Sequence, residues 1–150
     1  MRGRLFWLIS RVAIVLYRHF PVFGRIRGAV GIVRRDGGFV VLKRSDGYGY
    51  GFPGGIRRPF EGAESALRRE IAEETGLKLI SAEQVLQYED EKMYPSSTTV
   101  FEAIVEGEIR SSWEGEVVVA SLSELQQKVM PAQRRIVEHL RQGANGGPGR

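Results

Sequence analysis

The chain has 150 residues, of which 42% are hydrophobic and 27% are charged, the composition of one globular domain of ordinary size. It contains no cysteine, which excludes disulfides, thiolate metal ligands and a cysteine nucleophile. A cysteine-free chain fits a reducing compartment, so we expect a cytoplasmic protein. The net charge of +4 reflects arginines gathered in the first quarter of the chain, and it favours anionic partners such as phosphates, acidic lipid or RNA.

Residues 5–20 have apolar side chains at three- and four-residue intervals, which predicts an amphipathic helix. Arg11 interrupts the apolar run, so the segment is too short to span a membrane, and no cleavage site typical of a signal peptide follows it. Three interpretations stay open, of which we favour the first. The helix packs on the domain or on a second subunit of a homodimer, it lies in a membrane interface, or it is partly disordered in isolation. The same basic region could also bind RNA.

Two strands and a hairpin turn are expected next. Residues 28–35 and 39–43 are rich in β-branched side chains, and the second run is apolar enough to be buried on both faces of a sheet. The Asp-Gly-Gly sequence at 36–38 supplies the turn between them. The loop at 45–51 is rich in glycine and tyrosine, and Tyr48 is a candidate for stacking on a substrate or for ordinary loop packing.

Residues 64–75 predict a helix, and Gly76 can adopt the left-handed conformation that ends it. Glu70, Glu73 and Glu74 lie within about one turn of one another on this helix, so their like charges repel. An arginine or a divalent cation would offset that repulsion. Oxygen-only ligands suit magnesium or manganese rather than zinc. A solvated acidic helix face is the alternative.

The rest of the chain predicts three more strands and two helices. The strands are expected at 85–93, 98–106 and 116–120. Ser121 and Glu124 resemble a capping box that opens a short helix. Pro131 suits the first turn of a final helix that ends near Arg141.

The helix at 64–75 and the loop before it contain a spaced pattern of residues. The pattern is Gly55-x5-Glu61-x7-Arg69-Glu70-Ile71-x-Glu73-Glu74-x-Gly76-Leu77. It resembles the Nudix box, the signature of the Nudix hydrolases, with every fixed position filled. The resemblance implies an α+β Nudix fold, in which a mixed β-sheet is sandwiched between α-helices, and the amphipathic N-terminal helix is an addition to that plan. The expected regions are an N-terminal helix and connector at 1–27, a Nudix domain at 28–142 and a disordered tail at 143–150.

The resemblance also implies which groups hold a metal. Magnesium, or manganese, would be bound by Glu70, Glu73 and Glu74 and by the backbone carbonyl of Gly54, and the three glutamates would be catalytic together with Arg69. We expect Arg69 to steady Glu73 and the loop before the helix, and Glu61 to act through a water or a salt bridge. The general base is a box glutamate or a later carboxylate, for which the candidates are Glu116, Glu114, Glu89, Asp90 and Glu91.

The loop before the first box glutamate departs from the family pattern. Phe60 stands where family members often have glycine, and Arg57, Arg58 and Pro59 precede it. We therefore expect an altered loop shape and a local positive charge. Arg57 and Arg58 are candidates for binding a further phosphate of the substrate, or they are solvated.

With the resemblance, the sequence predicts a magnesium-dependent hydrolase of a nucleoside diphosphate linked to another group. Nucleoside triphosphates, nucleotide sugars, dinucleoside polyphosphates and capped RNA all stay open as substrates. The alternatives from other classes are a catalytically silent module that binds a nucleotide, and a protein that associates with membrane or RNA through its basic N-terminal helix.

Overall fold

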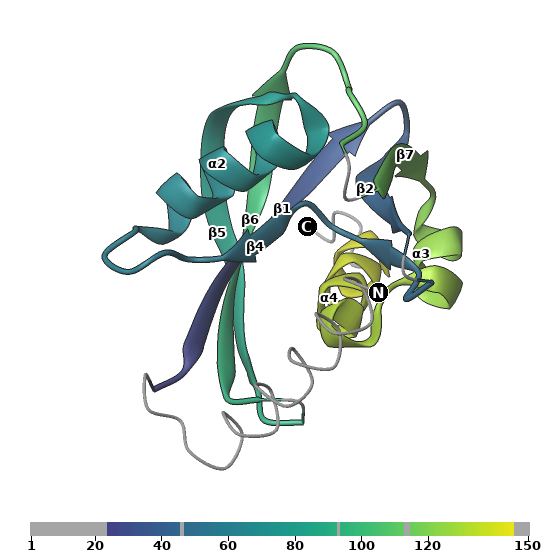
Figure 1. Ribbon diagram of the computed structural model, residues 1–150. Helices are drawn as coiled ribbons and strands as arrows, with labels where there is room; N and C mark the ends of the chain where they lie inside the picture. Colours follow the sequence, from purple (N-terminus) through teal and green to yellow (C-terminus); the bar gives the residue numbers. More distant parts are fainter. Residues whose placement is uncertain (1–23, 46, 93, 113–114, 146–150) are drawn as a thin grey trace, which may run out of the picture.

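A mixed β-sheet forms the centre of the domain. The computed structural model describes residues 24–45, 47–92, 94–112 and 115–145. Within these residues the sheet has seven strands (Figure 1). Five of them follow the order β3-β2-β1-β6-β5, with β1 (Ile26–Arg35) in the middle, and the other two, β4 and β7, pair with β1 and β2. β1 runs parallel to β6 (Ser96–Glu106), which pairs antiparallel with β5 (Lys78–Asp90).

The second edge of β1 is divided between two strands. Its first half pairs with β4 (Gly54–Ile56), and its last residues pair with β2 (Gly38–Arg44). β2 in turn pairs with β3 (Tyr50–Gly51) and β7 (Gly115–Ala120). Because β2 and β4 take different parts of β1, the sheet divides at this edge, and the site described below lies beside the division.

A tight turn joins β1 to β2. Asp36 and Gly37 have φ angles of 49° and 77°, which is the backbone of a hairpin turn with both central residues left-handed. This confirms the turn predicted from the Asp-Gly sequence. β2 is buried from Gly38 to Leu42, as expected for a strand covered on both faces.

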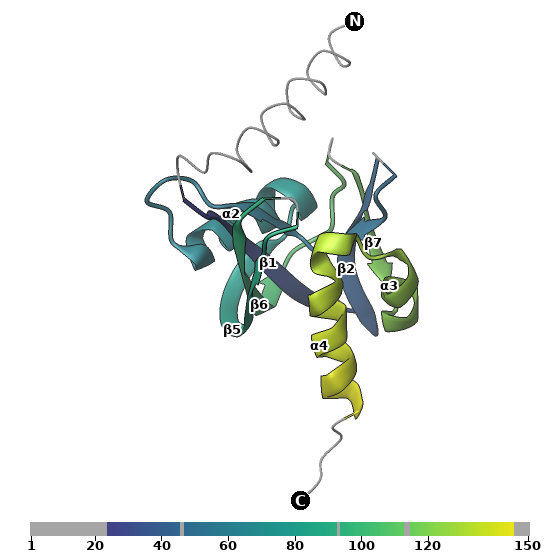
Figure 2. The same cartoon turned by 90° about the horizontal axis from the view of Figure 1, so that it is seen from below.

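Helices cover both faces of the sheet (Figures 1 and 2). α2 (Ala63–Thr75) packs on one face, where Leu67 and Ile71 join a buried cluster with Ala29 and Val33 of β1. On the other face lie α3 (Leu122–Lys128), the 3-10 turn η1 (Pro131–Gln133) and α4 (Arg134–Asn145). They enclose a second cluster, which contains Val30, Ile32, Leu125, Ile136 and Leu140. Successive residues of β1 therefore serve opposite cores, as the period of a strand requires.

The elements predicted from residue 28 onward are present, with differences at their boundaries. β5 begins at Lys78 rather than at residue 85, because bulges after Leu79 and Gln84 break its alternation. The sequence does not predict β3 and β4, which are only two and three residues long and contain glycine. α4 continues to Asn145, past the predicted end near Arg141, so the tail predicted at 143–150 is helical at its start. Its remainder, 146–150, lies outside the described residues.

The predicted N-terminal helix falls on residues 1–23, which also lie outside the described residues. The connector is expected to end at residue 27, whereas β1 begins at Ile26. Of the helices that the structure describes, none has the length and apolar character needed to cross a bilayer.

Candidate active site

α2 presents acidic side chains to one edge of the sheet because its apolar side is fixed. Leu67 and Ile71 are fully buried, and they lie against Gly31 of β1, where an added Cβ would come within 2.9 Å of Leu67. The helix ends at Gly76, whose φ is 73° and whose N–H donates to the Ala72 carbonyl. The predicted left-handed C-cap is thus confirmed, and the box glutamates face β4 and the loop before the helix.

Arg69 and Glu61 form the strongest ion pair in this region. Arg69 Nε donates to Glu61 Oε1 and Arg69 Nη2 donates to Glu61 Oε2, both at 2.9 Å. The backbone N–H of Arg58 adds a bond of 2.8 Å to the same carboxylate. The Arg69 guanidinium, and then the Arg58 N–H, lower the pKa of Glu61 from 4.5 to about 2. The same pairing raises the pKa of Arg69. Of the two routes expected for Glu61, the structure shows the salt bridge.

The third nitrogen of Arg69 contacts two predicted metal ligands. Arg69 Nη1 donates to Glu70 Oε1 at 2.5 Å and lies 3.5 Å from Glu73 Oε2. The Glu70 carboxylate lies over β4, because a Cβ added to Gly55 would stand 2.5 Å from Glu70 Oε1. Glu70 is therefore enclosed between the helix and β4, whereas Glu73 is about half exposed. The expected contact of Arg69 with Glu73 is present, and its contacts with Glu61 and Glu70 are shorter.

Glu74 connects the end of α2 to the start of β4. The Gly54 N–H donates to Glu74 Oε2 at 2.8 Å, and Glu74 is only 8% exposed. Gly54 has a φ of 150°, and a Cβ there would lie 2.2 Å from the Ala29 carbonyl oxygen. Only glycine fits this position, so β4 can approach both β1 and the helix.

The ligand atoms available at this site are oxygens, which fit a hard divalent ion. Carboxylate oxygens, with a backbone carbonyl, are ligands that Mg²⁺ and Mn²⁺ accept. Glu70 and Glu73 share one nitrogen of Arg69, and Glu74 accepts a bond from the Gly54 N–H at the start of β4. The three carboxylates therefore lie on the side of α2 that faces β4 and the box loop. Among the described residues no three such side chains converge on a single point, since these carboxylates are turned to Arg69 and to the Gly54 N–H. A bound ion would compete with those partners. It would neutralise charge on phosphoryl oxygens and activate water.

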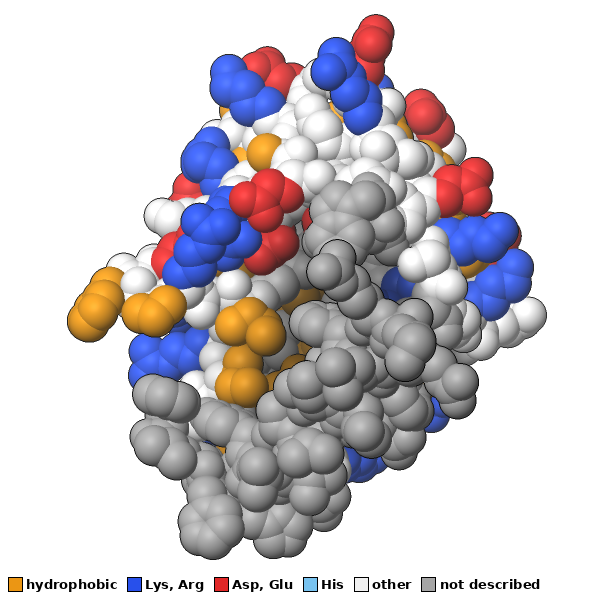
Figure 3. Space-filling model, in the orientation of Figure 1, with side chains coloured by type: hydrophobic (Ala, Val, Ile, Leu, Met, Phe, Trp, Pro, Cys, Tyr) orange, Lys and Arg blue, Asp and Glu red, His pale blue; other side chains and the backbone are white. Residues whose placement is uncertain are grey.

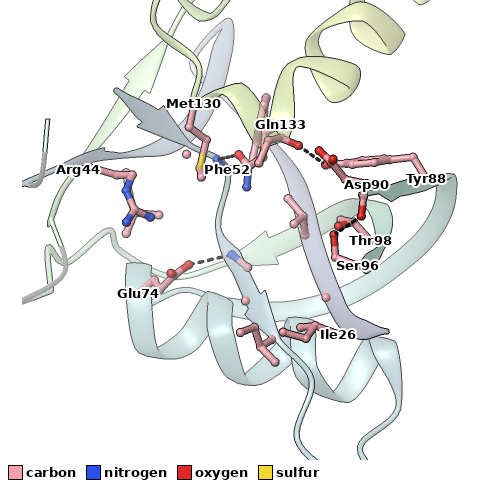
Figure 4. A pocket seen from close by; sticks show the side chains of 18 of the residues that line it. Ile26, Arg44, Phe52, Glu74, Tyr88, Asp90, Ser96, Thr98, Met130 and Gln133 are labelled. Atoms are coloured by element: carbon pink, nitrogen blue, oxygen red, sulfur yellow. Dashed lines mark hydrogen bonds between the residues drawn. The ribbon is translucent and has the colours of Figure 1, made fainter. Parts of the chain in front are cut away.

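A cleft of about 740 Å³ adjoins the predicted metal site. Glu74 and Arg44 point into it from α2 and from the end of β2, and Gln133, Tyr88 and Asp90 line its other end (Figure 4). Its remaining lining includes Gly28, Val30, Leu42, Phe52, Gly54, Ser96, Thr98 and Met130. A pocket of this size, partly apolar and with a few fixed polar groups, is typical of a small-molecule site.

Two hydrogen bonds fix the far wall of the cleft. The Phe52 N–H donates to Gln133 Oε1 at 2.7 Å, and Gln133 is 9% exposed. The Tyr88 hydroxyl donates to the Ala132 carbonyl at 2.9 Å, and burial raises the pKa of Tyr88. Since an N–H needs an acceptor, the amide oxygen of Gln133 is committed to Phe52 and its amide nitrogen is left for other partners.

The predicted substrate-binding residues lie outside this cleft. Arg57 donates twice to the Glu61 carbonyl, at 2.9 and 2.7 Å, and Arg58 approaches Glu73 at 3.7 Å. Both arginines line a second, more open groove beside the box loop. Tyr48 is 63% exposed and does not line the cleft.

The candidates for the general base are dispersed. Of the later carboxylates, Asp90 lines the cleft. Glu89 and Glu91 pair with Arg25 instead, and Glu116 stands 3.9 Å from Lys43 on the outside of β7. Glu114 lies outside the described residues.

Arg44, Tyr88 and Gln133 are cleft residues that sequence reasoning does not single out. Arg44 carries a usable signal, since it is the charged residue that ends a buried strand directly before a glycine-rich loop. Gln133 carries none, because its place beside Phe52 depends on a contact between positions 81 residues apart.

Comparisons with known proteins agree with this geometry. The family model of the NUDIX domain matches residues 24–140. The solution structure of the E. coli ORF135 protein is similar with a TM-score of 0.74 and 24% identity, covering 87% of this chain and 99% of that one. The crystal structure of the MutT NUDIX hydrolase from Burkholderia pseudomallei is similar with a TM-score of 0.65 and 27% identity, covering 76% of this chain and 96% of that one.

A sequence match covers a shorter stretch. This chain is 42% identical over 59 residues to "Putative 8-oxo-dGTP diphosphatase YtkD" of Bacillus subtilis (strain 168), which is 39% of this chain and 37% of that protein. The family model, by contrast, spans most of the chain. The protein therefore belongs to the Nudix family.

Proposed function

We propose that the protein is a divalent-metal-dependent diphosphatase of nucleoside triphosphates that prefers an oxidised guanine nucleotide. It would release the nucleoside monophosphate and pyrophosphate. The observation that carries the proposal is the single cleft that runs from Glu74 and Arg44 to Gln133 and Asp90. The similarity to YtkD over 59 residues supports the choice of substrate.

The end of the cleft at Glu74 suits the triphosphate. Glu70, Glu73 and Glu74, with the Gly54 carbonyl, are the groups that we assign to Mg²⁺ or Mn²⁺. Arg44 points into the same end of the cleft and supplies a fixed positive charge for phosphate oxygens (Figure 4). Arg69 does not line the cleft, so we assign it the task of holding Glu61, Glu70 and Glu73 in place.

The other end of the cleft suits a guanine-type base. The amide nitrogen of Gln133 is a donor, because its oxygen is bonded to Phe52 N–H, and it matches the O6 acceptor of guanine. Asp90 supplies an acceptor at the same end for the N1–H and 2-amino groups, which adjoin O6 on the same edge of that base. Adenine presents an amino group in place of O6, so a donor at Gln133 would disfavour it.

The general base is proposed to be one of the box glutamates. Of the later candidates within the described residues only Asp90 lines the cleft, and it lies at the end away from Glu74 (Figure 4). Glu73 is the most exposed of the box glutamates and has the longest contact with Arg69. It can therefore move toward a water molecule with the smallest loss of ion-pair energy.

A substrate panel tests the proposal. The purified protein with Mg²⁺ is offered 8-oxo-dGTP, dGTP, dATP, a nucleotide sugar, a dinucleoside polyphosphate and 5′-triphosphate RNA, and the products are separated chromatographically. We expect monophosphate and pyrophosphate from 8-oxo-dGTP, with kcat/KM at least about tenfold above that for dATP. Faster turnover of the nucleotide sugar or of the RNA would refute the proposed substrate. Binding of nucleotides with no turnover of any of them would favour the silent binding module.

A further inference from the structure

The box loop between β4 and α2 holds a phenylalanine out into solvent. Phe60 is fully exposed, with a relative exposure of 109%, and its φ of 65° is a left-handed conformation that bulky side chains rarely adopt. Pro59 beside it is exposed, and Ile56 at the base of the loop is 57% exposed. The loop thus exposes Phe60 and Pro59 at its tip and Ile56 at its base.

The loop holds this shape through its own hydrogen bonds. Arg57 donates twice to the Glu61 carbonyl, and the Glu61 N–H donates to the Arg58 carbonyl at 3.0 Å. The Glu61 carboxylate is in turn held by Arg69 and by the Arg58 N–H. Phe60 lies between the residues that make these bonds, so the backbone that carries its ring is held away from the domain.

Basic side chains line the groove next to the exposed ring. Arg25, Arg27, Arg57 and Arg58 line it together with Phe60, and so do Glu61 and Glu89. Glu89 pairs with Arg25, and Arg57 is bonded to the Glu61 carbonyl, which leaves Arg27 and the 65% exposed Arg58 as the arginines nearest to solvent. Figure 3 shows hydrophobic side chains projecting at this edge of the molecule with Lys and Arg side chains beside them. We call Ile56, Pro59, Phe60, Arg25, Arg27 and Arg58 the Phe60 face. An exposed apolar tip with arginines beside it is the pattern of a surface that inserts shallowly between anionic lipid headgroups.

The chain enters the domain on this same face. Gly24, the first described residue, lines the groove beside Phe60. The residues before it have the amphipathic, arginine-containing sequence for which a membrane interface is one of the open interpretations. A single weak membrane contact binds only marginally, and stable association needs two. The Phe60 face lies where a second contact would reinforce the first.

We propose that the Phe60 face binds an anionic lipid surface, with the Phe60 ring inserted between headgroups and with Arg27 and Arg58 contacting lipid phosphates. This inference is independent of the nucleotide on which the enzyme acts. It places the membrane next to the catalytic helix, because Glu61 joins the loop directly to Arg69. Single-stranded RNA fits this face less well. Phe60 is the only aromatic among the described residues that line the groove, whereas strands bind along successive stacking platforms.

A single-site fluorophore tests the proposal in the full-length chain. The chain has no cysteine, so Phe60→Cys carries one environment-sensitive label, and Ile104→Cys, at a 65% exposed position on β6, is the matched control. With vesicles rich in phosphatidylserine we expect a blue-shifted, several-fold brighter signal at position 60 and no change at position 104. With phosphatidylcholine vesicles the signal at position 60 should change little. Equal signals at the two positions, or no change at either, would overturn the proposal.

A second variant separates lipid binding from folding. Phe60→Gly removes the ring and suits the left-handed φ, so thermal stability should be kept or raised. Its partition coefficient onto anionic vesicles should fall about tenfold, the expected effect of losing one inserted aromatic side chain. Unchanged partitioning of Phe60→Gly would contradict the proposal, as would a loss of affinity for an RNA oligonucleotide in place of vesicles.

Discussion

Arg69 and Glu61 are joined by two parallel hydrogen bonds of 2.9 Å, between a helix residue and a loop residue eight positions earlier. Through its third nitrogen Arg69 also contacts Glu70 and Glu73. One guanidinium therefore sets the position of the box loop relative to two predicted metal ligands. A planar arginine can make all of these contacts at once, and a lysine cannot.

Replacing this arginine tests its positioning role. Arg69→Lys keeps the charge and loses the paired geometry, so we expect kcat to fall about tenfold or more, with a smaller change in KM. Arg68→Lys is the matched control on the same helix, and it should change kcat less than about twofold. Mn²⁺ affinity, measured by electron paramagnetic resonance, should change in Arg69→Lys alone, because Arg69 positions Glu70 and Glu73 and also competes with an ion for them. Unaltered kcat and Mn²⁺ affinity would show that the bidentate pair has no role in the site.

The Arg69–Glu61 pair also predicts how stability depends on pH. The pKa of Glu61 is lowered from 4.5 to about 2 in the folded protein. The pair therefore stabilises the fold fully above pH 4.5, and this contribution is lost as the pH falls from 4.5 toward 2. The urea midpoints of wild type and Glu61→Gln should differ at pH 6 and converge toward pH 2.5. Glu83→Gln, at an exposed position on β5, should show no such convergence. A wild-type to Glu61→Gln difference that stays constant over this range would contradict the assignment.

Conservative changes at the box glutamates test the metal assignment. Glu70→Gln and Glu74→Gln remove a negative ligand with almost no change in shape, so each should lower kcat at least about tenfold. Removing divalent ions with a chelator should abolish activity in the wild type, and added Mg²⁺ should restore it. Glu64→Gln, in the first turn of the same helix, should behave as wild type. Wild-type turnover by Glu70→Gln or Glu74→Gln would show that the carboxylate concerned is not a ligand.

Two variants of Gln133 separate base recognition from folding. Gln133→Glu keeps an oxygen for Phe52 N–H and removes the donor, so KM for guanine-type substrates should rise about tenfold or more at similar stability. Gln133→Leu also leaves the buried Phe52 N–H without its acceptor, which should cost about 1–3 kcal/mol of stability. Thermal unfolding and a comparison of 8-oxo-dGTP with dATP measure both effects. An equal change of KM for the two nucleotides would remove Gln133 from base recognition.

The box helix could be predicted from sequence because its signals are local. Gly76 marks the end of α2, which the structure confirms, and the apolar side chains of Leu67 and Ile71 lie one turn apart on the helix. The capping box of Ser121 and Glu124 at the start of α3 is confirmed for the same reason. Local spacing also brings the glutamates together, although which partner each one faces does not follow from it.

The cleft could not be predicted because it depends on long-range pairing. β4 joins β1 through Gly54, whose conformation only glycine adopts easily, and Gln133 meets Phe52 only after the chain has passed through six further elements. The partner of Arg57 likewise depends on the loop's left-handed turn at Phe60, which sequence propensity disfavours. From the sequence Arg57 is a candidate for binding phosphate. In the structure its side chain is bonded to the Glu61 carbonyl within the same loop.

The most direct test of the account is the product of Mg²⁺-dependent hydrolysis of 8-oxo-dGTP, followed by phosphorus NMR for the wild type and for Glu70→Gln. We expect monophosphate and pyrophosphate in equal amounts from the wild type, and formation of both at least about tenfold slower with Glu70→Gln. Release of orthophosphate by the wild type, or equal rates for the two proteins, would contradict it.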